Sequence, residues 1–483
     1  MQPHLQPSSR TGARMTPDIR EVMTDMALFG HQFGGDSWKS WVTLLSGFFG
    51  VKLPSHEMSL FSTLTGRETA PKQEFKELWL AVGRRGGKSQ VAALLAVFEA
   101  VFSDHETKLS AGEVATVLVL AADRKQARSV FRYIAGLLHS NPMLEQLILR
   151  EDKESIELSN RTVIEIGTAS FRSTRGYTLL AVIADEIAFW RTEESANPDA
   201  EIIAALRPAL TTLDGKLIAI SSPYSKRGEL YRHSQRYWGS EDPDILFARA
   251  PSRVMNPLIP ERVIQAAKDR DLASAMAEYE AEFRNDIESY IDIEYLARLT
   301  RSEPPELPPF SGTRYMAFVD PSGGGADGFS LCIGHTENGL VVIDLLTERT
   351  YTAPAAVVQE YAMILKRYQI GELTGDRYAG QWVSQEFEKH FIDYKFSTMT
   401  RTELYQDFLA VANSGRVELP PTPKDKLLSQ FSNLERRTTR NGRDIIDHSP
   451  GTHDDLANAV AGLAAQAINQ QAAPTHLKVR WTT

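Results

Sequence analysis

Short runs of apolar residues alternate with longer amphipathic stretches through the first half of the chain. The runs are continuous, which is typical of strands covered by helices on both faces. They predict strands at residues 78–82, 116–121, 179–184 and 217–220. Helical periodicity follows the first two, over residues 90–102 and 124–138, and residues 155–158 and 162–166 predict a hairpin. This alternation of strand and helix predicts a parallel α/β sheet.

The order of elements changes in the second half. Three consecutive strands are predicted there, followed by a helix, a short strand ending at Asp376 and a last helix. The strands are residues 315–319, 329–334 and 340–345, and the helices are residues 353–368 and 454–468. This order predicts a second α/β domain.

Composition shifts suggest where the domains begin and end. Residues 301–312 are rich in proline and predict a linker. About the first 20 residues are polar and predict disorder. An aromatic cluster before residue 75 predicts short helices forming a lid or an N-terminal subdomain. The predicted parts are an N-terminal tail and helical lid segment (1–75), a first domain (76–300), the linker (301–312), a second domain (313–470) and a C-terminal tail (471–483).

Length, charge and cysteine content narrow the class of protein. A chain of 483 residues is long enough for more than one core. The formal net charge of −9 argues against a protein that coats nucleic acid over its whole surface, so any DNA contact must be local. The single cysteine, Cys332, lies in an apolar run and is expected to be buried. Since it excludes an internal disulfide, and the N-terminus lacks the apolar core of a signal peptide, a soluble cytoplasmic protein is expected.

A glycine-rich segment joins the first predicted strand to its helix. Residues 83–89 read Gly-Arg-Arg-Gly-Gly-Lys-Ser. A strand, a glycine turn and a helix are the context that a phosphate-binding loop needs, because backbone N–H groups and the helix N-terminus face the phosphates. The strict pattern places a first glycine where this chain has Val82, so the segment alone is also compatible with an ordinary turn. Its candidate nucleotide-binding residues are Arg85, Gly86, Gly87, Lys88 and Ser89.

Carboxylates at the end of a later strand strengthen the case for a nucleotide site. The apolar run 179–184 ends in Asp185 and Glu186. Asp185 can assist Mg²⁺ and Glu186 can polarise an attacking water. Residues 221–223, Ser-Ser-Pro, close the next strand, where a polar group could sense the γ-phosphate, although they are also compatible with an ordinary turn. Arg175 precedes the acidic strand and could act on the nucleotide of a neighbouring subunit, whereas Arg84 and Arg85 could act in cis.

The second half carries acidic residues at three strand or helix ends. Asp320 ends a strand and is followed by the glycine-rich residues 321–327, Asp376 ends a later strand, and Asp454 and Asp455 open the last helix. An acidic pair at a helix start also has a plain explanation in capping. Taken together, the positions predict a ribonuclease-H-like arrangement in which carboxylates hold two Mg²⁺ or Mn²⁺ ions about 4 Å apart.

On these motifs the chain resembles the large terminase subunits of tailed bacteriophages, over about residues 28–465. The order of the motifs carries the resemblance: a phosphate loop with an internal arginine and no first glycine, an Asp-Glu strand, and then three acidic sites. The resemblance implies an α/β fold in which a P-loop NTPase domain with a parallel sheet is followed by a ribonuclease-H-like nuclease domain. It also implies ATP-driven movement of viral double-stranded DNA into a procapsid and metal-dependent cutting of the DNA concatemer.

The resemblance also implies roles for individual residues. Lys88 and Ser89 would bind phosphate and Mg²⁺, Asp185 would assist the metal and Glu186 would activate water. Arg84 and Arg175 match arginines proposed to act on the γ-phosphate, and Gln32 and Arg67 are candidates for contacts to adenine. The implied nuclease metal ligands are Asp320, Asp376 and one or both of Asp454 and Asp455, with Asp327 as an auxiliary ligand.

The implied cofactors are ATP and Mg²⁺, with Mn²⁺ possible at the nuclease site. The implied partners are double-stranded DNA, a portal protein, a small terminase subunit and further copies of the chain. The copies would form a ring, usually of five, in the cytoplasm of the bacterial host and transiently on the procapsid. Two alternatives are a cellular helicase-nuclease for DNA repair, which should carry further helicase arginine motifs, and an inactive prophage portal-binding remnant, which should have broken acidic sites.

Overall fold

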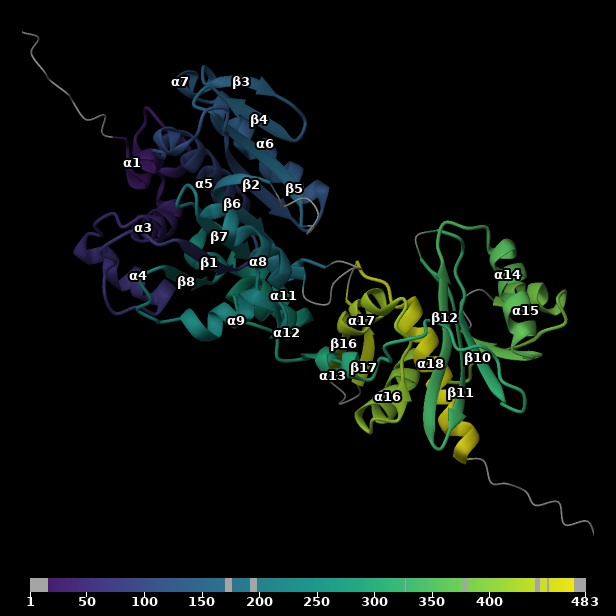
Figure 1. Cartoon of the computed structure of the whole chain (residues 1–483). Helices are drawn as coiled ribbons and strands as arrows, with labels where there is room; N and C mark the ends of the chain where they lie inside the picture. The colour runs from purple at the N-terminus through teal and green to yellow at the C-terminus, as the bar shows by residue number, and fades with distance from the viewer. Residues whose placement is uncertain are drawn as a thin grey trace, which may run out of the picture. The chain divides into compact units, whose positions relative to one another are not determined.

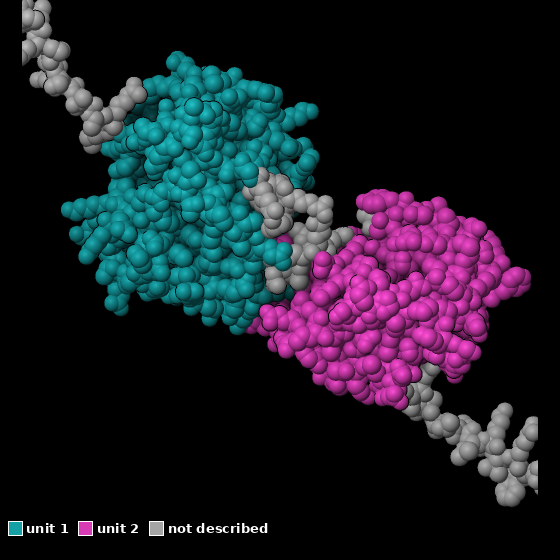
Figure 2. All heavy atoms as spheres, viewed as in Figure 1, with its two compact units in different colours: residues 1–190, 199–284 teal, residues 191–198, 285–483 magenta. Residues whose placement is uncertain are grey.

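The computed structural model divides the chain into two compact units (Figure 2). Unit 1 comprises Met1–Trp190 and Asp199–Arg284, and unit 2 comprises Arg191–Pro198 and Asn285–Thr483. The structure describes residues 16–169, 176–191, 198–325, 327–376, 380–438, 444–449 and 451–472. In these ranges, no helix combines the length and the apolar character that crossing a membrane requires.

Unit 1 is built on an eight-stranded sheet in the order β3-β4-β5-β2-β6-β7-β1-β8 (Figure 1). Within this order, the neighbouring strands β5, β2, β6, β7, β1 and β8 run parallel. The strands β3 and β4 pair antiparallel at one edge of the sheet. The strands are β1 Glu77–Val82, β2 Ala115–Ala121, β3 Ile148–Glu151, β4 Ser155–Leu158, β5 Thr162–Thr168, β6 Thr178–Asp185, β7 Lys216–Ser221 and β8 Ile245–Ala250. The predicted parallel α/β sheet is therefore confirmed.

Helices cover both faces of this sheet, which explains the continuous apolar strands. Leu78, Leu80 and Val82 of β1 pack in a core with α5 and α6, while Trp79 and Ala81 face a second core with α8 and α9. The helices are α1 Ile19–Thr24, α2 Gly30–Phe33, α3 Lys39–Phe48, α4 Met58–Thr65, α5 Lys88–Phe102, α6 Arg124–His139, α7 Pro142–Glu145, α8 Pro198–Leu210, α9 Gly228–Tyr237, α10 Ser252–Met255, α11 Glu261–Arg270 and α12 Leu272–Glu280.

Unit 2 contains a six-stranded sheet in the order β14-β13-β10-β11-β12-β15 (Figure 1). The strands β10 to β12 form an antiparallel meander, and β13 and β14 continue the sheet parallel to β10. This is the ribonuclease-H-like strand order that the sequence predicts. The strands are β10 Tyr315–Asp320, β11 Phe329–Glu337, β12 Leu340–Arg349, β13 Glu372–Gly375, β14 Asp393–Phe396 and β15 Val417–Glu418.

Helices also cover both faces of the second sheet. One core joins Phe318, Cys332 and Ile343 to α16, α17 and α18, and the other joins Val319 and Leu331 to α14 and α15. Cys332 is fully buried, as expected. The helices are α13 Ile293–Arg298, α14 Pro354–Arg367, α15 Gly380–Glu388, α16 Arg401–Asn413, α17 Lys424–Ser432 and α18 Asp455–Ala472. A three-stranded sheet of β9 Ile287–Ser289, β16 Leu434–Thr438 and β17 Asp444–His448 completes the unit.

The division between the units falls earlier than the proline-rich segment 301–312. Residues 285–300 pack in unit 2, where β9 pairs with β16 and Leu296 of α13 is buried. The proline-rich segment is itself attached to unit 2, because Leu307 N donates to Asp344 O (2.9 Å). Proline content marks a chain without regular structure, but it does not exclude such attachment. The segment expected to be disordered, about the first 20 residues, overlaps α1, which begins at Ile19, and residues 1–15 lie outside the described residues.

Candidate functional site

In unit 1, three strand ends bring the predicted nucleotide motifs together. The strand β7 lies between β1 and β6, and all three run parallel. Ala81 of β1 pairs with Ser221 of β7, and Asp185 of β6 pairs with Ile220 of β7. The loop 83–89, the Asp-Glu pair and the Ser-Ser-Pro turn therefore lie at one edge of the sheet.

The loop backbone is fixed by side chains from distant segments. These side chains bind loop carbonyl groups, and the donor–acceptor pairs are Trp41 Nε1 to Gly86 O at 2.8 Å, Ser252 Oγ to Arg84 O at 2.7 Å and Asn256 Nδ2 to Arg85 O at 3.0 Å. Gly87 has a φ of 94°, a region that favours glycine, and a Cβ there would lie 3.1 Å from the Trp41 ring nitrogen. Held in this way, the loop leads directly into α5, whose N-terminus is suited to an anion.

Lys88 begins α5, and its side chain is buried at this edge. Its ammonium donates to Ser222 Oγ (2.7 Å) and to Val82 O (3.2 Å) and lies 3.5 Å from Glu186 Oε1. The predicted phosphate-binding lysine is thus held against the serine turn and the acidic strand end. Ser89, the predicted Mg²⁺ ligand, follows it in the first turn of the helix.

Asp185 and Glu186 have different surroundings at the end of β6. Asp185 is buried, and its Oδ1 has no hydrogen-bond partner in the described part of the chain. Burial, reinforced by the charge of Glu186, raises the pKa of Asp185 to about 7. Glu186 has a left-handed backbone (φ 51°), and its Oε2 accepts from Ser221 Oγ and Ser222 N, both at 3.1 Å. Glu186 is therefore held by the turn, while Asp185 retains an unused oxygen.

Two of the predicted arginines, Arg84 and Arg85, are exposed, whereas Lys88 is buried. Arg84 is exposed, and its guanidinium lies 3.0 Å from Glu278 Oε1 of α12. Arg85 is exposed and has a positive φ of 61°. Arg175 lies outside the described residues.

A cavity of about 520 Å³ lies beside α5, close to the loop. It is lined by Gln32, Phe33, Trp38, Gln90, Arg132, Tyr133, Gly136 and Leu137. The Trp38 ring reaches the loop, since a Cβ on Gly87 would lie 3.2 Å from it. Gln32, a candidate for an adenine contact, thus lines a cavity next to the loop. Arg67, by contrast, is buried and donates to Ser240 O (2.8 Å) and Asp242 O (3.0 Å).

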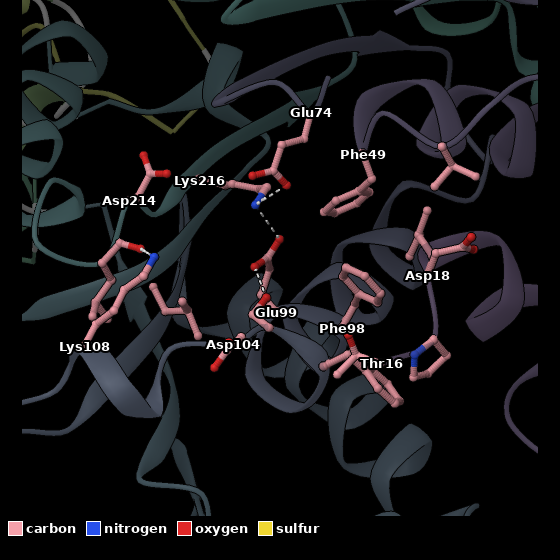
Figure 3. Close-up of a pocket in the computed structure, with 17 residues that line it drawn as sticks. Thr16, Asp18, Phe49, Glu74, Phe98, Glu99, Asp104, Lys108, Asp214 and Lys216 are labelled. Carbon is pink, nitrogen blue, oxygen red and sulfur yellow. Dashed lines mark hydrogen bonds and ion pairs between the residues drawn. The ribbon is translucent and has the colours of Figure 1, made fainter. Parts of the chain in front are cut away.

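A second cavity in unit 1, of about 300 Å³, lies at the end of the sheet where β7 begins (Figure 3). Lys216, at the start of β7, lies 3.6 Å from Glu99 Oε1 and 3.2 Å from Glu74 Oε2. Burial raises the pKa of Glu99. Because Lys216 and Ser221 mark the two ends of β7, this cavity is separated from the nucleotide motifs by the length of the strand. It is not part of the candidate site.

In unit 2, Asp320 ends β10 in a buried position facing the start of α18. Asn458 Nδ2 donates to Asp320 Oδ2 (2.7 Å). Burial raises the pKa of Asp320 well above its usual range, and the charges of Asp455 and Asp454 raise it further. This concentration of negative charge is unfavourable by itself and suits a bound cation.

The structure distinguishes the two aspartates at the start of α18. Asp454 is buried, and its Oδ2 accepts from Tyr405 OH (2.6 Å). Asp455 Oδ2 accepts from Gly328 N (2.9 Å), and burial raises the pKa of Asp455 to about 6. Asp327, the expected auxiliary ligand, is instead 3.0 Å from His453 Nδ1.

Arg401, the first residue of α16, also lies beside these carboxylates, although no motif along the chain marks it. Its guanidinium lies 3.3 Å from Asp454 Oδ1 and 3.7 Å from Asp376 Oδ2. No three Asp, Glu, His or Cys side chains among the described residues converge closely enough to hold one metal ion. The oxygen donors suit Mg²⁺ or Mn²⁺ chemically, but an arginine now lies between two of the expected ligands.

The fold is thus a parallel α/β sheet carrying a phosphate-loop motif, together with a ribonuclease-H-like sheet. No protein-family model matches the sequence, and no curated protein matches it. Solved structures similar to it are large terminases. That of bacteriophage HK97 is 15% identical with a TM-score of 0.39, covering 86% of this chain and 95% of the other.

A large terminase of a thermophilic bacteriophage is 10% identical with a TM-score of 0.37, covering 83% of this chain and 96% of the other. The large terminase nuclease of thermophilic phage G20c is 16% identical with a TM-score of 0.32, covering 37% of this chain and 98% of the other. At these identities and TM-scores, the assignment of a function depends on the chain's own residues.

Proposed function

We propose that unit 1 is an ATPase whose reaction takes place at the carboxyl edge of its sheet. The observation that carries this proposal is the convergence of Lys88, Glu186 and Ser222 beside a loop of phosphate-binding sequence. Lys88 supplies positive charge to the phosphates, and Glu186 polarises the attacking water. Ser222 is hydrogen-bonded to both Lys88 and Glu186, so a change at the phosphate is transmitted through it to the turn after β7.

Mg²⁺ would be held by Ser89 and Asp185, where it neutralises charge on the phosphates. The unused oxygen of Asp185 supports this role. The base of the nucleotide would lie in the cavity lined by Gln32, Trp38 and Tyr133, because aromatic side chains and a glutamine amide suit a flat heterocycle with polar edges. Arg84 and Arg175 remain candidates for a charge acting on the γ-phosphate.

Unit 2 would be a metal-dependent endonuclease. Asp320, Asp376 and Asp455 would hold Mg²⁺ or Mn²⁺, which activate water and stabilise the leaving oxygen when bound. We assign Asp455 rather than Asp454 as the metal ligand because both oxygens of Asp454 already accept hydrogen bonds from protein donors. Asp454 then acts by positioning the start of α18.

Together these activities are those of a large terminase subunit, which moves viral double-stranded DNA into a procapsid with ATP and cuts the concatemer. The partners would be a portal protein, a small terminase subunit and further copies of the chain in a ring of five, in the cytoplasm of the bacterial host. The packaging role is tested by ATP-dependent protection of DNA inside empty procapsids that carry their portal. Absence of protection with an active ATPase would exclude it.

The ATPase assignment is tested with three variants. Lys88→Ala should weaken ATP binding at least tenfold, because the phosphate charge is lost. Glu186→Gln should bind ATP within about threefold of the unmodified chain, yet lose turnover by about a hundredfold or more, because the amide cannot act as a base. Lys125→Ala is the matched control, since Lys125 lies in the first turn of α6 after a parallel strand without a phosphate loop. Native turnover in Glu186→Gln would refute the assignment.

A further inference from the structure

Arg401 places one positive charge among carboxylates from three separate segments. Its Nη1 lies 3.3 Å from Asp454 Oδ1 and 3.8 Å from Asp447 Oδ1, and its Nη2 lies 3.7 Å from Asp376 Oδ2. These partners belong to the start of α18, to β17 and to the end of β13. A guanidinium is suited to this position because its planar fork presents several donors at once.

The helix that carries Arg401 fixes its position. Thr400 caps α16, accepting from Glu403 N, while the Glu403 side chain accepts from Thr400 N. Tyr405, one turn after Arg401 and fully buried, donates to the second oxygen of Asp454. Residues four apart lie on the same face of a helix, so a single turn of α16 supplies both donors to one buried carboxylate.

We propose that Arg401 is a positioning residue that serves as the resident cation of this carboxylate cluster. It holds Asp376 and Asp454 in place while no metal is bound, and it competes with divalent ions for Asp376. This inference rests on the proposed nuclease function. Because an ion bound at Asp376 repels the guanidinium, Arg401 lowers the affinity of the site for the metal. It also prevents Asp376 from closing on Asp320 and Asp455 before the ion arrives.

The test is a calorimetric titration of the full chain with Mn²⁺, without nucleotide. The same titration of Asp320→Asn defines the binding that belongs to this cluster. Arg401→Gln keeps hydrogen-bonding capacity but removes the charge, and it should tighten that binding roughly tenfold. Arg401→Lys keeps the charge and should stay within about twofold of the unmodified chain. Arg367→Gln is the matched control, because Arg367 pairs with Glu306 in the same unit.

Each outcome has a distinct meaning. Unchanged or weaker Mn²⁺ binding in Arg401→Gln would overturn the role of Arg401, as would equal tightening in Arg401→Lys. Absence of Asp320-dependent binding in the unmodified chain would instead overturn the proposed nuclease function. If Arg401→Gln does not fold, the guanidinium resonances of Arg401 in the unmodified chain are followed during a Mg²⁺ titration. They should shift with the midpoint of metal binding, and constant resonances would refute the proposal.

Discussion

At the scale of single residues, Asp185 should leave a measurable mark on the pH dependence of stability. Its pKa is about 7 in the fold, against an ordinary value of 3.8. The folded chain therefore keeps a proton that the unfolded chain loses, so the contribution of Asp185 to the free energy of unfolding falls as pH rises between these values. Asp185→Asn should remove this pH-dependent loss of stability, which amounts to a few kcal/mol over the whole range, on the order of 1.4 kcal/mol per pH unit.

The measurement is urea unfolding at pH 5 and pH 8, without nucleotide or Mg²⁺, followed by tryptophan fluorescence. Trp79 and Trp190 are buried in unit 1 and report its unfolding. Asp269→Asn on the exposed side of α11 serves as the control. If Asp185→Asn and the unmodified chain lose stability equally between the two pH values, Asp185 does not hold the raised pKa.

Substitution of the two aspartates at the start of α18 should have different effects on activity and stability. Asp455→Ala should abolish Mn²⁺-dependent cleavage with little loss of stability, because Asp455 accepts one backbone N–H and its ionised form is disfavoured by burial. Asp454→Ala should lower the free energy of unfolding of unit 2 by about 3 kcal/mol, since Tyr405 and Arg401 would lose their shared partner. Plasmid nicking and urea unfolding of both variants separate these effects. Native nicking by Asp455→Ala would exclude it as a ligand.

At the scale of elements, the strands with a continuous apolar run were predictable, and the two-residue strand β15 was not. The strands β1, β2, β6 and β7 are continuous apolar runs, and the structure places each within a residue or two of the prediction. The strand β15 has only two residues, so it presents no pattern along the chain. Its place is decided by tertiary pairing with β12.

The same contrast holds for the candidate site. Strand ends and glycine turns predicted Lys88 and Asp185 because parallel strands bring their carboxyl ends to one edge of the sheet. Arg401 gave no comparable signal: an arginine in the first turn of a helix is usually solvated, and its three partners lie in other segments. Trp41 was also missed as a support of the phosphate loop, since its bond to Gly86 joins residues 45 positions apart.

That bond gives a prediction about how helix α3 supports the loop. Trp41→Phe keeps the aromatic ring but leaves the buried Gly86 carbonyl without its donor. The free energy of unfolding of unit 1 should fall by about 1–3 kcal/mol, and ATP affinity should weaken severalfold because the loop loses a restraint. Fluorescent-nucleotide titration and urea unfolding measure both effects. Trp238→Phe, at a partly exposed tryptophan of unit 1, is the control, and equal behaviour of the two variants would contradict the role of Trp41.

At the scale of the whole molecule, the unit boundary decides which fragment can stand alone. Tyr290, Ile291 and Leu296 precede the proline-rich segment, yet all three are buried in the core of unit 2. Tyr290 OH also donates to Tyr405 O (2.5 Å) on the helix that carries Arg401. A fragment beginning at residue 313 would lose three large apolar side chains, and the burial of each stabilises the fold by about 1.5–3 kcal/mol. Together these losses would remove most of the free energy of unfolding of a typical domain.

We therefore expect a fragment of residues 285–483 to fold, and one of residues 313–483 to unfold or aggregate. The longer fragment should cut DNA with Mn²⁺ or Mg²⁺ and without ATP, since the phosphate loop lies in the other unit. It should show little sequence preference because metals act on phosphates, which carry no sequence information, and cleavage should weaken as salt rises. Circular dichroism and plasmid nicking test both fragments, with Asp320→Ala as the inactive control. If the longer fragment folds but does not cut with either metal, unit 2 is not an independent nuclease.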